Sequence, residues 1–174
     1  MTTTIAVLAR ALTYATLFCG LLLVFVPGRV LSTTGVTGPA SFGALQVAGV
    51  IVAAAGATLV VWCILTFVVV GRGTPAPFDP PRRLVARGPY GWVRNPMYLG
   101  AGLALVGAAL YYGSGGLLVY SGGFLLFMHL FVVLYEEPTL RSTFGADYEA
   151  YCRRVHRWWP HAHAPAACWQ PRGG

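Results

Sequence analysis

The sequence has few charged residues and no lysine. Only 10% of its 174 residues are charged, against about 25% in a typical soluble domain. All twelve basic residues are arginine, and 56% of the chain is hydrophobic. So few charges exclude a soluble globular surface and predict a protein whose surface faces lipid. The formal net charge of +7 is then expected to set the orientation of the loops and to face anionic lipid headgroups. No nucleic-acid partner is expected.

Cysteine is also scarce, which excludes two further kinds of site. The four cysteines lie far apart in the sequence. They do not form a disulfide framework pattern, and those inside apolar runs are expected to pack as small hydrophobic residues. The histidines and the cysteine near the C-terminus lack a recognised zinc spacing, so no metal site is expected.

Long apolar runs predict an all-α integral membrane bundle of about four transmembrane helices, since a span needs about 20 apolar residues. The second run carries Gly49, Ala53 and Ala57 on one small face suited to close helix packing. The third run is short, and a glycine-rich turn follows it, so the last two runs predict a helical hairpin. The first run is predicted to end at Pro27-Gly28, with a loop over residues 29–41. The four candidate spans are Ile5–Val26, Phe42–Val70, Met97–Tyr112 and Leu117–Tyr135.

We expect residues 1–174 to form one membrane domain in four parts. Five arginines lie between residues 71 and 96 and five more after residue 140, whereas residues 28–41 hold one. The positive-inside rule therefore predicts that both termini and the basic loop are cytoplasmic, in a bacterial-type inner membrane or its equivalent. The first run is too long for a typical signal peptide and is predicted to be retained. The oligomeric state stays open. The parts are two spans over 1–70, a basic cytoplasmic loop over 71–96, the hairpin over 97–135 and an amphipathic C-terminal segment over 136–160.

The segment after the fourth run has one apolar helical face, because its apolar residues are spaced by four, four, three and four. This face is predicted to lie on the membrane. Gly145 is expected to end one short helix and Asp147 to cap the next. The residues of the face are Leu140, Phe144, Tyr148, Tyr151 and Val155.

A polar motif opens the third run. Pro96 suits the first turn of a helix and Asn95 its N-cap. A helix N-terminus favours a carboxylate or phosphate, and Arg94 adds a forked cation. Tyr98 lies less than one turn inside and is able to cover an aromatic ring. Plain helix capping with an interfacial arginine is the alternative interpretation.

Two acids, Glu136 and Glu137, follow the fourth run directly. The C-terminal end of a helix is unfavourable for acids, so a cationic partner is expected. Solvation, or pairing with arginines of the 71–96 loop, is the alternative. His129 lies seven residues earlier, which predicts that it shares a face with Glu136, and it needs a polar partner. The hairpin would bring this face beside the start of the third helix.

These two stretches resemble a known superfamily. "GPYGWVRNPMYLG" and "HLFVVLYEEPTLRSTFGADYEAYCRRVHRWWP" are similar to the isoprenylcysteine carboxyl methyltransferase and phospholipid methyltransferase superfamily. Its signature is R-[HN]-P-x-Y-x-G followed by E-E-x-x-L-x-x-x-F-G-x-x-Y-x-x-Y. The resemblance covers roughly residues 78–160. It implies an integral membrane methyltransferase that uses S-adenosylmethionine and acts on a lipophilic small-molecule or lipidated acceptor among membrane lipids.

The resemblance also implies roles for individual residues. It assigns catalytic roles to Arg157 and His129. Small-residue packing is the alternative for Gly100 and Gly102. Substrate contacts are expected at Arg154, Arg157, Tyr148 and Tyr151. Cofactor contacts are expected at Arg94, Asn95, Pro96, Met97, Tyr98, Leu99, Gly100, Gly102, Glu136 and Glu137.

The acceptor is less defined than the cofactor. An isoprenylcysteine carboxyl O-methyltransferase-like activity is the first expectation, and phospholipid N-methyl transfer or thiol S-methyl transfer are the alternatives. Asn95 replaces the histidine of many prenylcysteine enzymes, and Val155-His156-Arg157 replaces a common V-P-R. More distant alternatives are an NADPH-dependent sterol-reductase-like protein and a non-enzymatic membrane scaffold.

Overall fold

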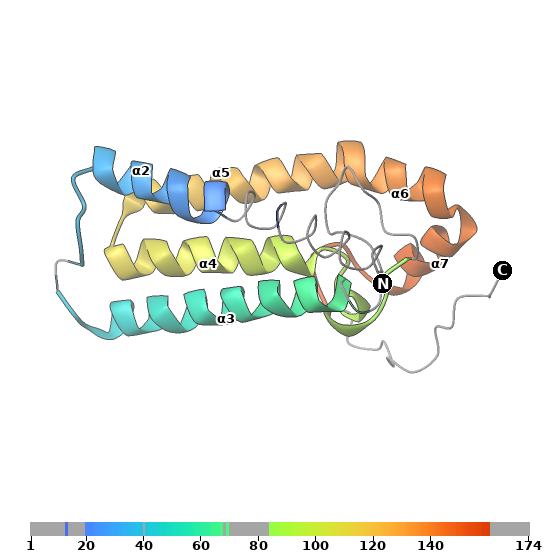
Figure 1. The fold of residues 1–174 in the computed structure, drawn as a ribbon, viewed down its shortest axis with the longest axis horizontal. Helices are drawn as coiled ribbons and strands as arrows, with labels where there is room; N and C mark the ends of the chain where they lie inside the picture. The colour runs from blue at the N-terminus through green and yellow to red at the C-terminus, as the bar shows by residue number, and fades with distance from the viewer. Residues whose placement is uncertain (1–12, 14–19, 40, 68, 70–83, 161–174) are drawn as a thin grey trace.

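The computed structural model describes residues 13, 20–39, 41–67, 69 and 84–160. Within these residues the chain forms helices and no β-strand, which confirms the predicted all-α class. In chain order the elements are η1 (Gly20–Phe25), α2 (Val26–Thr33), α3 (Ala44–Thr66), η3 (Gly88–Gly91), α4 (Pro96–Tyr112), α5 (Gly115–Phe131), η4 (Val132–Glu136), α6 (Glu137–Phe144) and α7 (Ala146–Arg154) (Figure 1).

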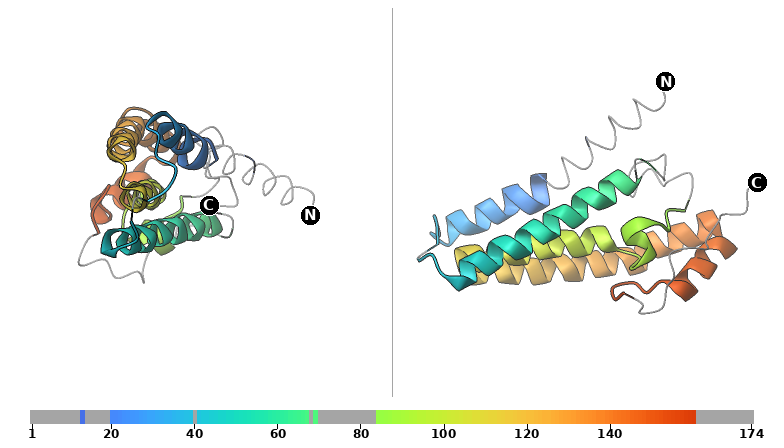
Figure 2. Two further views of the ribbon diagram at one scale, coloured as in Figure 1. Left: turned by 90° about the vertical axis from the view of Figure 1, so that its left-hand side faces the viewer. Right: turned by 90° about the horizontal axis from the view of Figure 1, so that it is seen from below.

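The long helices run side by side along the molecule, with α4 between α3 and α5. α2 lies beside α5, and the end-on view in Figure 2 shows these four helices as one bundle. Gly113, with a φ of 61°, closes α4 and starts the tight turn into α5. Near this turn Phe42 contacts Tyr111, with ring centroids 6.5 Å apart. We call this the turn end of the bundle; α6 and α7 lie at the opposite end.

α3 and α4 pack with their backbones in close contact. A Cβ added to Gly107 would lie 2.4 Å from the backbone nitrogen of Ala53, and one added to Gly56 would lie 2.5 Å from the carbonyl oxygen of Gly100. The predicted small face of the second span is therefore correct at Gly49 and Ala53 but wrong at Ala57, which is exposed. The 3.6-residue period of the helix carries the contact to Gly56 instead.

The outward faces of the bundle are apolar. Such a surface is stable against lipid tails and not against water. The core between α3, α4 and α5 is built from Val60, Ala101, Leu105, Phe124 and Met128. Exposed large apolar side chains on α3 and α5 include Val50, Ile51, Val61, Leu65, Leu118, Val119, Leu126, Phe127 and Leu130.

Two helices in the described part of the chain are long and apolar enough to cross a bilayer. They are Ala44–Thr66, with 23 residues, and the continuous helical stretch Gly115–Phe144, with 30. Gly20–Thr33 and Pro96–Tyr112 are apolar but shorter. Two of the four predicted spans thus have the length and composition that a bilayer span requires. Most of the first predicted span, residues 5–12 and 14–19, lies outside the described residues.

Two predicted helix ends are wrong. Pro27-Gly28 does not end the first helix, which continues through α2 to Thr33. Pro27 occupies the first turn of α2, where a missing N–H is tolerated. The fourth helix does not end at Tyr135 but continues to Phe144, because the glutamates that follow the apolar run have partners inside the protein.

The C-terminal segment folds onto the protein. Its apolar face is buried with Leu84 and is completed by Leu140, Phe144, Tyr148, Tyr151 and Val155, so the predicted packing on the membrane is corrected to packing on the chain itself. Gly145, with a φ of 50°, ends α6 as predicted. It also caps α7, so Asp147 lies in the first turn of that helix and not at its cap.

Candidate functional site

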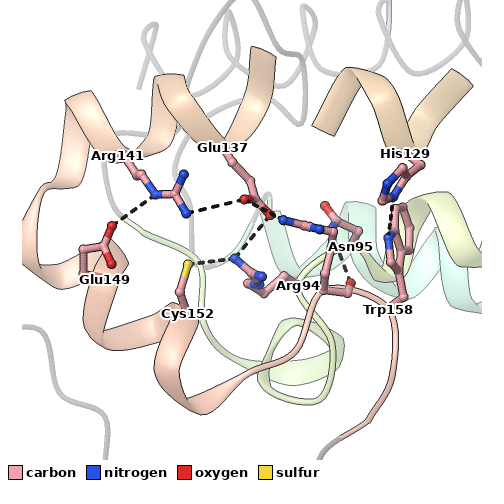
Figure 3. Close-up of polar contacts among 9 residues, drawn as sticks. Arg94, Asn95, His129, Glu137, Arg141, Glu149, Cys152 and Trp158 are labelled. Carbon is pink, nitrogen blue, oxygen red and sulfur yellow. Dashed lines mark hydrogen bonds and ion pairs between the residues drawn. The ribbon is translucent and has the colours of Figure 1, made fainter. Parts of the chain in front are cut away.

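The start of α4 and the end of the long helix Gly115–Phe144 meet at one place. The hydroxyl of Tyr98 donates a hydrogen bond of 3.0 Å to Oε2 of Glu136. Nη1 of Arg94 lies 3.3 Å from Oε1 of Glu137 (Figure 3). Residues some forty positions apart in the sequence therefore form one polar cluster at the end of the bundle opposite the turn end.

Glu137 is the centre of this cluster and is 3% exposed. Arg157 binds it with two hydrogen bonds, from Nε to Oε1 at 2.7 Å and from Nη2 to Oε2 at 3.0 Å. This bidentate geometry is the strongest form of a guanidinium–carboxylate contact. Arg141 approaches Oε2 to 3.7 Å and also binds Glu149. Among the described residues, three arginines thus surround one buried carboxylate, which we call the Glu137 cluster.

Arg94 has an unused donor in this cluster. Its Nη1 donates to Sγ of Cys152 at 2.7 Å and pairs with Glu137. Its Nε is buried and has no hydrogen-bond partner within the described part of the chain. A buried donor without a partner costs about 1–3 kcal/mol. The site therefore favours an additional anionic oxygen beside Arg94.

Glu136 has different surroundings from its neighbour. Among the described residues Tyr98 is the hydrogen-bond partner of its carboxylate, and none of the arginines of the Glu137 cluster reaches it. Glu136 is half-buried. One carboxylate is therefore neutralised by arginines, whereas the adjacent one retains capacity to accept hydrogen bonds from a cation.

The residues after α7 form a strap against the start of α4. We define the C-terminal strap as residues 155–158. The backbone N–H of Arg94 donates to the carbonyl of His156 at 2.9 Å. Nδ2 of Asn95 donates to the carbonyl of Arg157 at 3.3 Å. Asn95 is the N-cap residue of α4 as predicted, but its side chain does not cap the helix; it holds the strap instead.

His129 is attached to the same strap. Nε1 of Trp158 donates to Nδ1 of His129 at 3.0 Å, as Figure 3 shows. His129 and Glu136 do not form the expected shared polar face. The π-helical turn η4 lies between these two residues, and they have different partners.

Several residues expected to contact a cofactor pack within the bundle. A Cβ on Gly100 would lie 2.8 Å from the carbonyl oxygen of Gly56, and one on Gly102 would lie 2.5 Å from Cδ2 of Leu125. Helix packing therefore accounts for the absence of a side chain at both positions, and their expected cofactor contacts stay a prediction. Met97 packs against the hydrophobic core. Pro96 and Leu99 belong to the first turn of α4, at the edge of the cluster.

Three residues expected to bind substrate are not at the surface of the cluster. Tyr148 and Tyr151 are buried in the core of the C-terminal segment, and the hydroxyl of Tyr151 donates to the carbonyl of Tyr90 at 2.7 Å. Burial raises the pKa of both phenols, so they stay neutral. Arg154 is exposed and donates to the carbonyl of Ala150 in its own helix. In this structure Tyr148 and Tyr151 therefore pack inside the protein and Arg154 faces solvent; their expected substrate contacts stay a prediction.

Three contributors to the site were missed from the sequence. Arg141 lies four residues after Glu137 in the same helix, a spacing at which an arginine is expected to reach a glutamate. Cys152 carries no motif that singles it out. Trp158 fits an interfacial belt from composition alone, and its contact with His129 is visible only in the fold.

Comparison with known families gives the class of this protein. A bundle of apolar helices with a buried arginine–glutamate cluster defines a helical protein suited to a bilayer. Residues 44–147, more than half of the chain, match the family model described as phospholipid methyltransferase, so the chain belongs to the phospholipid methyltransferase family. This confirms the superfamily recognised from the motifs. The family and the two long apolar helices indicate a membrane methyltransferase. No curated protein and no solved structure gives a significant match.

Proposed function

We propose that this protein transfers a methyl group from S-adenosylmethionine to a lipophilic acceptor at the membrane surface. The observation that carries the proposal is the meeting of the α4 start with Glu136 and Glu137, where a spare arginine donor and a spare carboxylate lie close together. Membership of a methyltransferase family supports the reaction class.

The residues of the cluster fit the chemistry of S-adenosylmethionine. Its carboxylate suits the unpaired Nε of Arg94 and the N-terminal end of α4. Its ammonium group or ribose hydroxyls suit the carboxylate of Glu136, which is held by Tyr98. When bound, S-adenosylmethionine supplies a methyl group on a positively charged sulfur.

The protein contributes to the reaction by aligning the acceptor and by supplying charged groups. The hydrogen bonds to Glu137 raise the pKa of Arg157, so this guanidinium keeps its charge and can orient an anionic part of the acceptor. An amine acceptor has to lose a proton, and Glu136 has the capacity to take it. A carboxylate acceptor needs no base. Most of the acceleration would come from orientation of the acceptor and exclusion of water.

Two acceptor classes follow from two observations. The family match and Asn95 favour the amine of a phospholipid. The arginines around Glu137 favour a carboxylate such as that of a prenylcysteine. We place the phospholipid amine first, because Glu136 supplies the base that only this acceptor requires.

Titration of the purified protein in detergent tests the proposal. We expect saturable binding of S-adenosylmethionine in calorimetry and none of NADPH. With a labelled methyl group on the donor, we expect label in phosphatidylethanolamine, and label in N-acetyl-S-farnesylcysteine would identify the second acceptor class. Glu149→Gln should bind S-adenosylmethionine like the unchanged protein, because Glu149 is exposed and lies outside the Glu137 cluster centre. Binding of NADPH alone would indicate a reductase, and binding of neither would indicate a scaffold.

A further inference from the structure

The contact between Trp158 and His129 determines where the imidazole carries its proton. Nε1 of Trp158 lies 3.0 Å from Nδ1 of His129, and the two rings are tilted by 39° with centroids 6.0 Å apart. An indole N–H donates and cannot accept. Nδ1 must therefore be the acceptor, and the neutral imidazole carries its hydrogen on Nε2.

This arrangement leaves His129 with one free function, which is donation from Nε2. Within the part of the chain that the structure describes, no group accepts a hydrogen bond from Nε2–H. Nδ1 is occupied and Nε2 already holds its hydrogen. His129 is therefore unsuited to take a proton from an amine acceptor, and the geometry favours donation to an oxygen.

The position of Trp158 is fixed by the contacts that its neighbours in the strap make with the rest of the protein. Arg157 next to it holds both oxygens of Glu137, and Asn95 holds the carbonyl of Arg157. Figure 3 shows Glu137 and His129 both projecting toward the strap from the long helix. The strap thus links the orientation of His129 to the cluster at which the methyl donor is proposed to bind.

We propose that Trp158 is a positioning residue that presents Nε2–H of His129 to an anionic oxygen of the lipid acceptor, either a carboxylate or a phosphate. This inference rests on the proposed function for the identity of the acceptor, whereas the tautomer of His129 is independent of it. Arg157 on the same strap supplies the positive charge that such an oxygen requires.

Nitrogen NMR of the full chain, labelled with ¹⁵N-histidine in a non-ionic detergent, tests the tautomer. The signal of His129 is assigned by its loss in His129→Gln. We expect an unprotonated Nδ1 and a protonated Nε2 in the unchanged protein, and a mixture of both tautomers in Trp158→Phe, which keeps an aromatic ring but removes the donor. Trp159→Phe is the matched control, because Trp159 is 77% exposed, and it should leave the signals unchanged.

Lipid titration tests the role of Nε2–H. N-acetyl-S-farnesylcysteine supplies a carboxylate and phosphatidylethanolamine a phosphate; the farnesylcysteine methyl ester and diacylglycerol are their uncharged counterparts. We expect the Nε2–H signal to shift saturably with at least one charged lipid and with neither uncharged one. The lipid that acts identifies the source of the oxygen. In the methyl-transfer assay, Trp158→Phe should lower kcat/KM for that acceptor about fivefold without changing the affinity for S-adenosylmethionine.

A proton on Nδ1 in the unchanged protein, or identical His129 signals in Trp158→Phe, would overturn the tautomer assignment. A correct tautomer with no shift on any charged lipid would overturn the oxygen-binding role. Failure of S-adenosylmethionine to bind would instead contradict the proposed function, and the lipid titration would still decide whether His129 meets an anionic oxygen.

Discussion

Glu136 and Glu137 are adjacent in the sequence but have different chemical environments. Glu137 is buried under three arginines, whereas Glu136 is held by a tyrosine hydroxyl. Removing the charge of Glu137 would leave guanidinium groups without their partner in a site from which water is largely excluded. Removing the charge of Glu136 would affect only the one hydrogen bond that its carboxylate accepts from the Tyr98 hydroxyl. The same substitution should therefore have different consequences at the two positions.

We predict that Glu137→Gln lowers stability and that Glu136→Gln lowers ligand affinity. Breaking one side of a buried ion pair costs about 3 kcal/mol, which corresponds to a fall in Tm of roughly 6 to 12 °C for a chain of this size. Glu136→Gln should keep the parent Tm but bind S-adenosylmethionine about tenfold more weakly or worse, since a charge-assisted hydrogen bond is lost. Thermal unfolding and calorimetry in one detergent measure both.

Equal loss of ligand affinity in the two variants with no change in Tm would contradict this division of roles. Glu149→Gln, whose side chain is half-exposed, corrects for the effect of the substitution itself. A stable Glu137→Gln protein would show that the three arginines are satisfied without the carboxylate.

The sequence was sufficient to predict some of these residues. The start of the third helix and the end of the fourth were predicted to lie side by side, and pairing of the two glutamates with arginines of the 71–96 loop was the alternative interpretation. The partners Cys152 and Trp158 were not predicted, since their contacts connect positions 58 and 29 residues apart. Such contacts depend on the path of the strap, which leaves no periodic pattern in the sequence.

At the scale of the helices, the contact between α3 and α4 is the closest in the described bundle. Glycine at positions 49, 56, 100 and 107 lets the two backbones approach to contact distance. In lipid, packing of this kind contributes strongly to helix association, because hydrophobic transfer between helices contributes little. The pair therefore forms a fixed support from which the start of α4 presents Arg94 and Tyr98.

We predict that Gly107→Ala destabilises the protein, whereas Gly122→Ala does not. The methyl group at position 107 would lie 2.4 Å from the Ala53 backbone, which has no room to move aside, whereas nothing lies within 4 Å of a Cβ at position 122. Alanine is also the better helix former by about 1 kcal/mol, so Gly122→Ala should keep or slightly raise Tm. Thermal unfolding of the two variants side by side measures the difference. Equal Tm values would indicate that α3 and α4 are separated more widely than the structure has them.

Element ends were harder to predict than element types. The apolar runs identified α3, α4 and α5 because lipid-facing helices show as long apolar stretches. The continuation of the fourth helix to Phe144 was not predicted, because its last turns are polar and are stabilised by Arg141 and Arg157 instead of by lipid. The amphipathic face of α6 and α7 was predicted correctly, but a periodic face does not reveal whether protein or membrane covers it.

At the scale of the whole molecule, the polar groups and the turn end lie at opposite ends of the bundle. The Glu137 cluster and the strap lie at one end, whereas residues 34–39 lie near the other, where Thr34 is close to Gly116. Of the described arginines, Arg94, Arg141 and Arg157 belong to the cluster itself, and Arg87, Arg153 and Arg154 lie in the segments next to it. We propose that this end faces the cytoplasm, since short loops rich in arginine are retained on that side.

We predict that Thr37→Cys is labelled from outside intact cells by a membrane-impermeant maleimide and that Arg153→Cys is labelled only after the cells are opened. Both positions are exposed. The background replaces the four native cysteines with alanine, so that each labelled protein reports one position. The opposite pattern would invert the orientation, and labelling of both positions from outside would show that the bundle does not separate the two compartments.

The strap is synthesised after every helix from α2 to α7. Before the strap is made, Glu137 lacks the side chain of Arg157, and Arg94 and Asn95 lack the strap backbone that they bind. The polar end of the bundle therefore has to remain hydrated while those helices enter the bilayer. A chain that stopped before residue 155 would keep these helices but lack the contacts that the strap makes with Glu137, Arg94 and His129.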